Sequence, residues 1–301
     1  MFELKNDKLA IPIVLIAGLF WSFGPLVVRY MNEPNLVPWQ YIFGRGLTIF
    51  ILLNLYLYFE EGINFYKNYK KVGISGLIGG VGLGIAMISF IYSITNTTAA
   101  ITLLCLAAMP FFTALLAFLF LKEKISLNVW ISIFLATIGI IIMAFGNDEK
   151  NSLIGFVFGI TSSIGFSVFS VTLRWRKETP KFTTVAIAGL FCFIIAFLVI
   201  LIKGQSFFST SYNSSMFSLH GTLVCLGLIL YSIGSKAIPA AELTLLSLTE
   251  VIGGIFWVWL PLFGINEVPS TNTIIGGFFL FISIFYYSLI MRWNKRFIAL
   301  N

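Results

Sequence analysis

Two charged side chains, Arg45 and Glu250, fall well inside long apolar stretches of the sequence, and they are the first candidates for chemistry. A charge surrounded by apolar groups is costly unless it is paired or hydrated, so one that persists there commonly serves a function. A carboxylate can bind an amine or carry a proton, and a guanidinium can bind a carboxylate through parallel hydrogen bonds. We therefore predict that Glu250 binds an amine or a coupling proton, and that Arg45 engages a carboxylate or holds a neighbouring helix.

Arg45 also has structural alternatives. Its guanidinium could bond backbone carbonyls, or its long stem could carry the charge toward the edge of the apolar region. Tyr41 and Thr48 share its face of a predicted helix, so Arg45 belongs to a polar stripe. The type of residue alone does not decide between these roles.

Glu250 lies on a second stripe of helical spacing, with Gly254 and Trp257 on the same face. That face combines a carboxylate, a residue that permits close approach of another backbone, and an indole. Gly254 is therefore one candidate hinge. Pro25 and Pro110 are the others, because a proline inside a helix frees a carbonyl and can kink the chain.

Deep aromatic residues form the third group of candidates. Trp21, with its neighbour Ser22, and Tyr92, Tyr231 and Trp257 fall near the middle of predicted spans. Aromatic faces can hold an apolar side chain or a cationic amine. Because 17% of the residues are aromatic, simple packing between helices is the alternative for each of them.

The composition determines what kind of protein must position these groups. The 301 residues are 58% hydrophobic and only 10% charged, whereas a soluble domain carries about 25% charge. An all-α integral membrane protein is predicted, because only a lipid environment accommodates so much apolar surface. The net charge of +7 does not indicate nucleic-acid binding, since the basic residues lie in short gaps between apolar runs. The three cysteines lack metal-ligand spacing, so we expect neither metal nor cofactor.

Ten transmembrane helices are predicted from apolar stretches of about 20 residues. They cover residues 10–30, 38–59, 72–94, 98–121, 127–145, 153–173, 183–203, 219–236, 241–263 and 272–291.

The distribution of Lys and Arg supports ten crossings. With the N-terminus inside, fifteen of the nineteen basic residues lie at inner ends of spans, three lie at outer ends, and Arg45 lies within a span. Positive residues favour the cytoplasmic side, and a missed or invented helix would destroy the asymmetry. Both termini are therefore predicted to be cytoplasmic. His220 falls at a predicted outer boundary and is assigned no role, whereas Glu123 and Glu267 fall at span ends and are expected to cap helices or pair with neighbouring lysines.

The sequence contains an internal repeat. GLFWSFGPLVVR (18–29) resembles SIGFSVFSVTLR (163–174), which pairs Arg29 with Arg174. FIYSITNTTAA (90–100) resembles ILYSIGSKAIPAA (229–241), which pairs Tyr92 with Tyr231. We predict two five-helix units, residues 1–150 and 151–301. Because five is odd, the second unit enters the membrane from the opposite side, and the repeats are inverted as in many secondary transporters.

Two long stretches add a specific resemblance. LCLAAMPFFTALLAFLFLKEKIS, ending at Ser126, and LSLTEVIGGIFWVWLPLFGINEVPS (246–270) look like the EamA family of the drug/metabolite transporter superfamily. Each half of that family has a helix that ends in a turn with a glutamate, matched here by Glu123 and Glu267. The second half departs from the pattern by about three extra residues near Pro261. The resemblance implies export or exchange of amino acids or related metabolites across a bacterial cytoplasmic membrane.

These observations predict a secondary active transporter for a small amphipathic metabolite. It would be an exporter or a proton-coupled or exchange carrier, and a monomer would suffice although a dimer is possible. The alternatives are a carrier of organic cations or nucleotide sugars, a channel, and a non-transporting scaffold. No nucleotide-binding loop or hydrolase motif occurs in the sequence, so we do not expect an enzyme.

Overall fold

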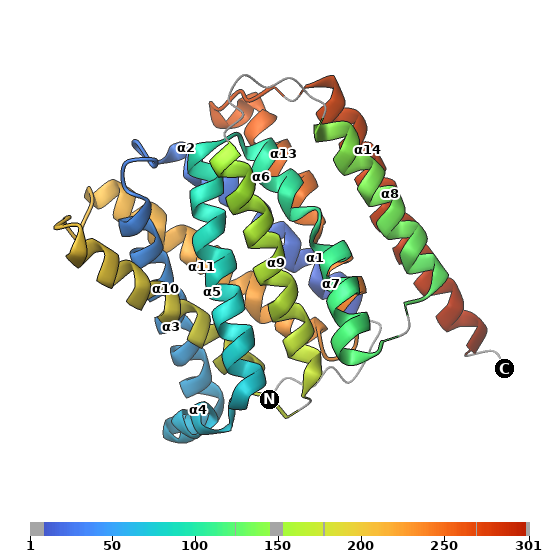
Figure 1. Ribbon diagram of the computed structural model, residues 1–301, viewed down its shortest axis with the longest axis horizontal. Coiled ribbons are helices and arrows are strands. Elements are labelled where there is room, and N and C mark those ends of the chain that lie inside the picture. Colours follow the sequence, from blue (N-terminus) through green and yellow to red (C-terminus); the bar gives the residue numbers. More distant parts are fainter. Residues whose placement is uncertain (1–8, 124, 145–152, 177, 269, 299–301) are drawn as a thin grey trace.

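The computed structural model describes residues 9–123, 125–144, 153–176, 178–268 and 270–298, and within these ranges the chain forms helices joined by turns (Figure 1). The α-helices are α1 (Ala10–Ser22), α2 (Gly24–Tyr30), α3 (Pro38–Glu61), α4 (Lys67–Lys71), α5 (Gly73–Asn96), α6 (Ala99–Leu106), α7 (Met109–Leu116), α8 (Leu127–Ala144), α9 (Leu153–Trp175), α10 (Lys181–Ile202), α11 (Ser211–Gly234), α12 (Ala240–Ser247), α13 (Thr249–Trp259) and α14 (Thr271–Ile298). Short 3-10 or π turns are η2 (Gly62–Tyr66), η3 (Ala117–Leu121) and η4 (Pro261–Phe263). The all-helical prediction is confirmed for this part of the chain.

Within the described residues, eight helical stretches are long and apolar enough to cross a membrane. They are Ala10–Tyr30, Pro38–Lys71, Gly73–Asn96, Ala99–Leu121, Leu153–Trp175, Lys181–Ile202, Ser211–Gly234 and Ala240–Trp259. Two shorter apolar stretches, Leu127–Gly139 in α8 and Ile274–Tyr287 in α14, fall where the fifth and tenth spans are predicted. A multi-pass membrane protein follows from these helices, whereas the full count of ten crossings stays a prediction.

Three of the spans are broken helices. The break between α1 and α2 falls at Phe23, and the break between α6 and α7 falls just after Leu106. Pro25 and Pro110 each lie in the first turn of the second helix, where the missing amide hydrogen is tolerated. The third break, between α12 and α13, falls at Leu248 without a proline. It is closed by short backbone bonds from Leu248 N to Leu245 O (3.2 Å) and from Val251 N to Leu248 O (3.0 Å).

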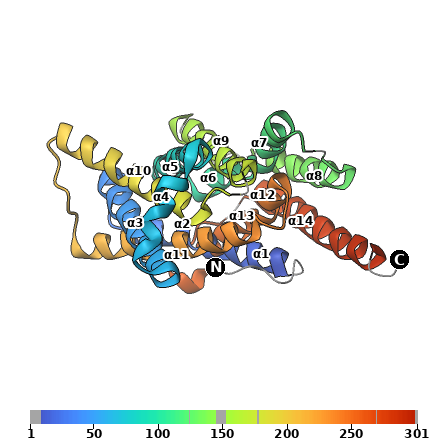
Figure 2. The same ribbon diagram turned by 90° about the horizontal axis from the view of Figure 1, so that it is seen from below.

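Helices from residues 1–150 pack mainly against helices from residues 151–301. The most extensive packing joins α5 to α9, α3 to α10, α8 to α14, α5 to α10, and α1 to α11. Two of these pairs mark opposite ends of the assembly, with α3 and α10 at one end and α8 and α14 at the other (Figures 1 and 2). The two sequence halves are therefore interleaved rather than separate.

Close backbone approach makes one of these seams possible. A Cβ atom added to Gly165 of α9 would lie 2.6 Å from the carbonyl oxygen of Gly82 on α5, and one added to Gly82 would lie 3.1 Å from the carbonyl oxygen of Gly165. Small residues allow such contact between membrane helices, where van der Waals packing stabilises association. The same two helices carry parts of the central cavity.

Three span boundaries differ from the prediction by four residues or more, one of them the end of α14, which continues to Ile298 rather than to residue 291. α11 begins at Ser211, eight positions before the predicted start, because its first two turns are polar and do not register as apolar. α13 ends at Trp259 rather than at residue 263, since Pro261 begins a separate 3-10 turn. Of the basic residues counted for orientation, Lys5, Lys8, Lys124, Lys150 and Lys177 lie outside the described residues.

Candidate functional site

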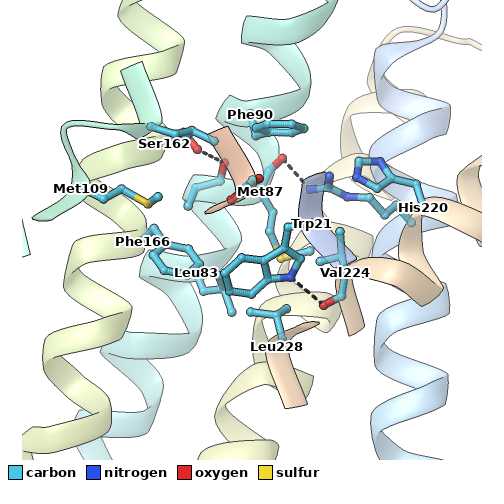
Figure 3. A pocket seen from close by; sticks show the side chains of 14 residues that line it. Trp21, Leu83, Met87, Phe90, Met109, Ser162, Phe166, His220, Val224 and Leu228 are labelled. Atoms are coloured by element: carbon cyan, nitrogen blue, oxygen red, sulfur yellow. Dashed lines mark hydrogen bonds between the residues drawn. The ribbon is translucent and has the colours of Figure 1, made fainter. Parts of the chain in front are cut away.

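A small cavity near the centre of the bundle brings together Arg45 and Glu250. It has a volume of about 60 Å³ and is lined from α1, α3, α5, α6, α7, α9, α11 and α13. Most of the lining is apolar, with Leu83, Met87, Met109 and Phe166 among its members (Figure 3). A typical ligand pocket measures at least about 300 Å³, so the cavity in this form is too small for a ligand of that kind.

Arg45 is held in this cavity by the first half of the chain. Its side chain is only 3% exposed, and its Nη2 donates a hydrogen bond of 2.8 Å to the carbonyl oxygen of Met87 on α5. The guanidinium also lies 6.0 Å from the ring centre of Tyr41 and 5.9 Å from that of Phe90. These contacts match the structural alternative in part, but a guanidinium has five donors, so most of its hydrogen-bonding capacity is still available.

Glu250 reaches the same cavity from the second half. It lies in the first turn of α13, just after the break at Leu248, where the helix dipole favours a negative charge. It is 9% exposed, and its carboxyl group has no hydrogen bond or ion pair of its own with another residue of the described ranges. A buried carboxyl without a protein partner is available to a proton or a ligand.

Trp21 lies above Leu228 in the view of Figure 3, with its indole nitrogen toward Val224. Its Nε1 donates to the carbonyl oxygen of Val224 at 3.2 Å, and its ring packs against Phe166 and Tyr231 at centroid distances of 5.4 and 5.3 Å. Gly227 leaves room for the indole, because a Cβ there would lie 2.1 Å from Nε1. The indole of Trp21 is thus fixed in position.

Comparison with known proteins identifies the type of bundle that carries this cavity. Residues 8–145 match the EamA-like transporter family. The first half of this chain is therefore similar to that family. The predicted resemblance is therefore confirmed, and it is independent of any assignment of substrate.

Curated relatives of this chain are named as transporters in general terms. A Helicobacter pylori protein named an uncharacterized transporter is 25% identical over 82% of this chain and 84% of its own length. A second Helicobacter pylori protein with the same name is 28% identical, and the match spans 56% of each chain. The Bacillus subtilis protein named uncharacterized transporter YdfC is 27% identical over 72% of each chain.

A crystal structure matches the fold over nearly the whole chain. The match covers 96% of this chain and 100% of the other, with a TM-score of 0.68 and 17% sequence identity. At that identity the likeness concerns the fold alone.

The central cavity also contains His220, which has no role in the sequence prediction. His220 is 2% exposed in the interior of α11, not at a boundary, because α11 begins earlier than predicted. Its Nδ1 hydrogen-bonds the hydroxyl of the fully buried Tyr41. A lone histidine gives no spacing signal, so only the correct start of α11 would have revealed it.

Other predicted binding residues lie around the cavity without lining it. Trp257 Nε1 donates to Ser22 Oγ at 2.8 Å, which ties α13 to α1. The hydroxyls of Tyr231 and Ser170 lie 2.7 Å apart and join α11 to α9.

Tyr92 packs against aromatic rings from α3 and α9. Gly254 contacts α6, since a Cβ there would lie 2.7 Å from Leu103 Cδ1. The transport roles of these residues stay predictions.

Two ion pairs join the halves at opposite ends of the bundle. Arg29 at the end of α2 pairs with Glu267, and its Nη atoms donate to the carbonyl oxygens of Ile94 (3.3 Å) and Thr97 (3.4 Å). The repeat predicts an equivalent on the other side, and Arg174 at the end of α9 has the same arrangement.

Arg174 Nε lies 3.1 Å from Glu123 Oε1, and its Nη1 approaches the carbonyl oxygens of Ser235 (3.5 Å) and Ile238 (3.4 Å). The repeat alignment pairs Ile238 with Thr97. Glu123 and Glu267 were expected to cap helices or pair with neighbouring lysines, and each pairs with an arginine of the other half. Lys124, one of the expected partners, lies outside the described residues.

Proposed function

We propose that this chain is a secondary carrier that moves a small zwitterionic metabolite, an amino acid or a close relative, by alternating access. Glu250 would bind the ammonium group and Arg45 the carboxylate. The observation that carries the proposal is that these opposite charges line one cavity but come from different halves of the chain. Glu250 has no partner of its own there, so a substrate amine would supply one.

The size of the cavity supports a moving site rather than a fixed pore. The space of about 60 Å³ is too small for an amino acid, and its polar groups are nearly shielded from solvent. Substrate entry therefore requires the halves to move relative to each other. A channel would instead be expected to present a polar filter or rings of charge.

The two equivalent ion pairs support inverted repeats. Arg29 with Glu267 and Arg174 with Glu123 join the halves at opposite ends, and the packing of α5 on α9 has its counterpart in that of α11 on α1. If one pair opens while the other holds, the cavity faces one side of the membrane. Exchange of the two states gives inward-open and outward-open forms of nearly equal energy.

Transport measurements on Glu250→Gln test the proposal. Purified protein in proteoliposomes should exchange a labelled amino acid against an unlabelled one, and Glu250→Gln should lower that exchange at least about hundredfold, because a charge-assisted hydrogen bond and a proton site are both lost. Glu33→Gln, an exposed change of the same type, should have no effect. Unchanged exchange and unchanged pH dependence in Glu250→Gln would refute the role.

An organic cation is the second candidate substrate. Arg45 is already bonded to Met87 O, whereas Glu250 has no hydrogen bond or ion pair among the described residues. Trp21, Phe90 and Phe166 line the same cavity. Aromatic faces with one carboxylate suit a cationic amine. Arg45→Gln distinguishes the substrates, because it should weaken transport of a zwitterion and leave that of a cation unchanged or improved. A nucleotide sugar fits less well, since Arg45 would be opposed by Glu250.

The orientation follows from the basic residues. We propose that Arg174 and Glu123 lie near the cytoplasmic side of the bacterial inner membrane, with Arg29 and Glu267 near the outer side and both termini cytoplasmic. Both halves of the cavity belong to one chain, so a monomer is sufficient. The direction of transport would then follow the solute and proton gradients.

A further inference from the structure

A second, larger pocket lies at the end of the bundle that carries Arg174. It has a volume of about 580 Å³ and is bordered by the end of α3, by α4, by the end of α9, by the start of α10 and by the residues after α11. It is separate from the central cavity, since no residue lines both.

The pocket is rich in positive charge. Lys71, Lys181, Lys236 and Arg174 line it, and Lys181 lies close enough to Lys236 and Arg174 to experience their charge. Among the described residues, none of the three lysines forms an ion pair. Lys181 Nζ donates to Ser235 Oγ at 2.8 Å, which aims its ammonium group at the residues that follow α11.

Two carboxylates offset only part of this charge. Glu61 and Glu178 also line the pocket, and Glu61 accepts a hydrogen bond of 2.7 Å from Asn68 Nδ2. Because Arg174 is already paired with Glu123, three lysines face two carboxylates, which leaves the pocket net positive. Like charges that gather without partners are costly unless an anion binds among them.

The start of α10 adds neutral donors to the lysines. α10 is 22 residues long, and its N-cap residue Pro180 provides no side-chain hydrogen bond to the first turn. The first backbone N–H groups of a helix have no partner inside the helix and favour an anion. Pro180, Lys181, Phe182 and Thr183 all line the pocket, so this helix start borders it.

Thr183 supplies an independent sign of a missing partner. Its side chain is 0% exposed, and its Oγ1 is buried without a hydrogen-bond partner. A buried hydroxyl in that condition is rare, because each unsatisfied donor costs free energy. An oxyanion in the pocket would satisfy it together with the first turn of α10.

We propose that this pocket binds the phosphate group of an anionic phospholipid. A phosphate has several acceptor oxygens, which suits donors that come from different elements: the ammonium groups of Lys181 and Lys236, the start of α10 and the hydroxyl of Thr183. Leu57, Leu173 and Phe182 supply an apolar border for the rest of the lipid. Basic pockets between the cytoplasmic ends of membrane helices commonly hold such headgroups.

Binding of lipid to the purified full-length chain tests the proposal. Native mass spectrometry or a fluorescence titration should show tighter binding of phosphatidylglycerol than of phosphatidylcholine. The double variant Lys181→Gln/Lys236→Gln should weaken phosphatidylglycerol binding about thirtyfold, at about fivefold for each lysine. Lys70→Gln removes the same charge from an exposed lysine of α4 outside the pocket, and it should bind as the parent does.

Thr183→Val separates binding from folding. The hydroxyl has no partner in the free protein, so its removal should leave thermal stability unchanged or slightly higher while it weakens binding several-fold. Inorganic phosphate distinguishes the source of the group: competition by millimolar phosphate, with the same dependence on Lys181 and Lys236, would support a phosphate site that is filled from solution. Equal binding of both lipids, or undiminished phosphatidylglycerol binding in the double variant, would overturn the proposal.

Discussion

The ion pairs at the two ends of this bundle repeat one arrangement, whereas the charged groups at its centre occur once. At the ends, Arg29 with Glu267 and Arg174 with Glu123 repeat one arrangement. In the centre, the repeat pairs Arg45 with Ala188 and, continued without a gap from Ala99 and Ala240, pairs Glu250 with Met109. Met109 and Glu250 both line the cavity, so equivalent positions carry a thioether and a carboxylate.

The difference separates two demands on the molecule. In the proposed carrier, opening and closing at either side would require similar energies at both ends, which duplicated contacts would provide. Recognition of one solute would require a particular set of groups, which two identical halves would not supply as both a cation and an anion. The proposal thus accounts for symmetry at the ends and its loss at the centre.

The largest effect is expected at the asymmetric centre. Arg45→Gln should lower exchange of a zwitterionic substrate about 10- to 100-fold, because a charged hydrogen bond to a carboxylate is lost. Arg176→Gln, an exposed arginine, is the matched control in the same proteoliposome assay. If an Arg45→Gln protein still exchanged amino acids at the parent rate, Arg45 would have no role in substrate recognition.

The packing of the Trp21 indole should be the next most sensitive feature. Gly227→Ala places a methyl group 2.1 Å from Trp21 Nε1 in the present geometry, so the indole must shift. Overpacking of this kind costs about 1–3 kcal/mol and should also disturb exchange. Thermal unfolding and tryptophan fluorescence check the result against Gly277→Ala, where an added Cβ meets nothing within 4 Å. If the two variants behave alike, Trp21 is not held as described.

A smaller effect is expected from the hydrogen bond between Tyr41 and His220. Tyr41→Phe keeps the ring and removes the hydroxyl, which leaves His220 Nδ1 without that partner. The expected cost is about 1 kcal/mol in the free energy of unfolding, measured by denaturation in detergent. Tyr66→Phe, at an exposed tyrosine, is the control and should be neutral. Equal stability of the two proteins would argue against a role of this bond in fixing the centre.

The smallest effects on stability are expected from the ion pairs at the two ends of the bundle. Glu123→Gln and Glu267→Gln should each cost less than about 1 kcal/mol in thermal stability, because both ion pairs are partly exposed to solvent. The two costs should be similar, as the glutamates are 24% and 35% exposed. A large difference between them would show that the ends are not equivalent, and Glu33→Gln again serves as the control.

Much of this site could be predicted from composition, because charges in apolar spans are rare. Arg45 and Glu250 were predicted for that reason, and both line the cavity. The partners of Glu123 and Glu267 were not predicted, since they lie 51 and 238 positions away in the sequence. Local spacing carries no information about such pairs, although the repeat itself aligned both arginines.

Some of the helix breaks could likewise be predicted from the sequence, and one could not. Pro25 and Pro110 indicate two of them from residue type alone, because proline cannot donate a backbone hydrogen bond. The break at Leu248 has no such signal, yet it puts Glu250 into the first turn of a helix. Tertiary packing determines it, which a single sequence does not display.

The central claim is that one cavity is accessible in turn from the two sides of the membrane. Labelling of a cysteine in the cavity tests this claim most directly. In a protein whose native cysteines are replaced, Val224→Cys places a thiol at the cavity wall. Glu267→Gln should raise its labelling from the outer side up to about fivefold, and Glu123→Gln should raise it by a similar factor from the cytoplasmic side, since a pair of this exposure is worth at most about 1 kcal/mol. Labelling from the same side in both variants, or no labelling from either side during exchange, would contradict two oppositely inserted halves around one cavity.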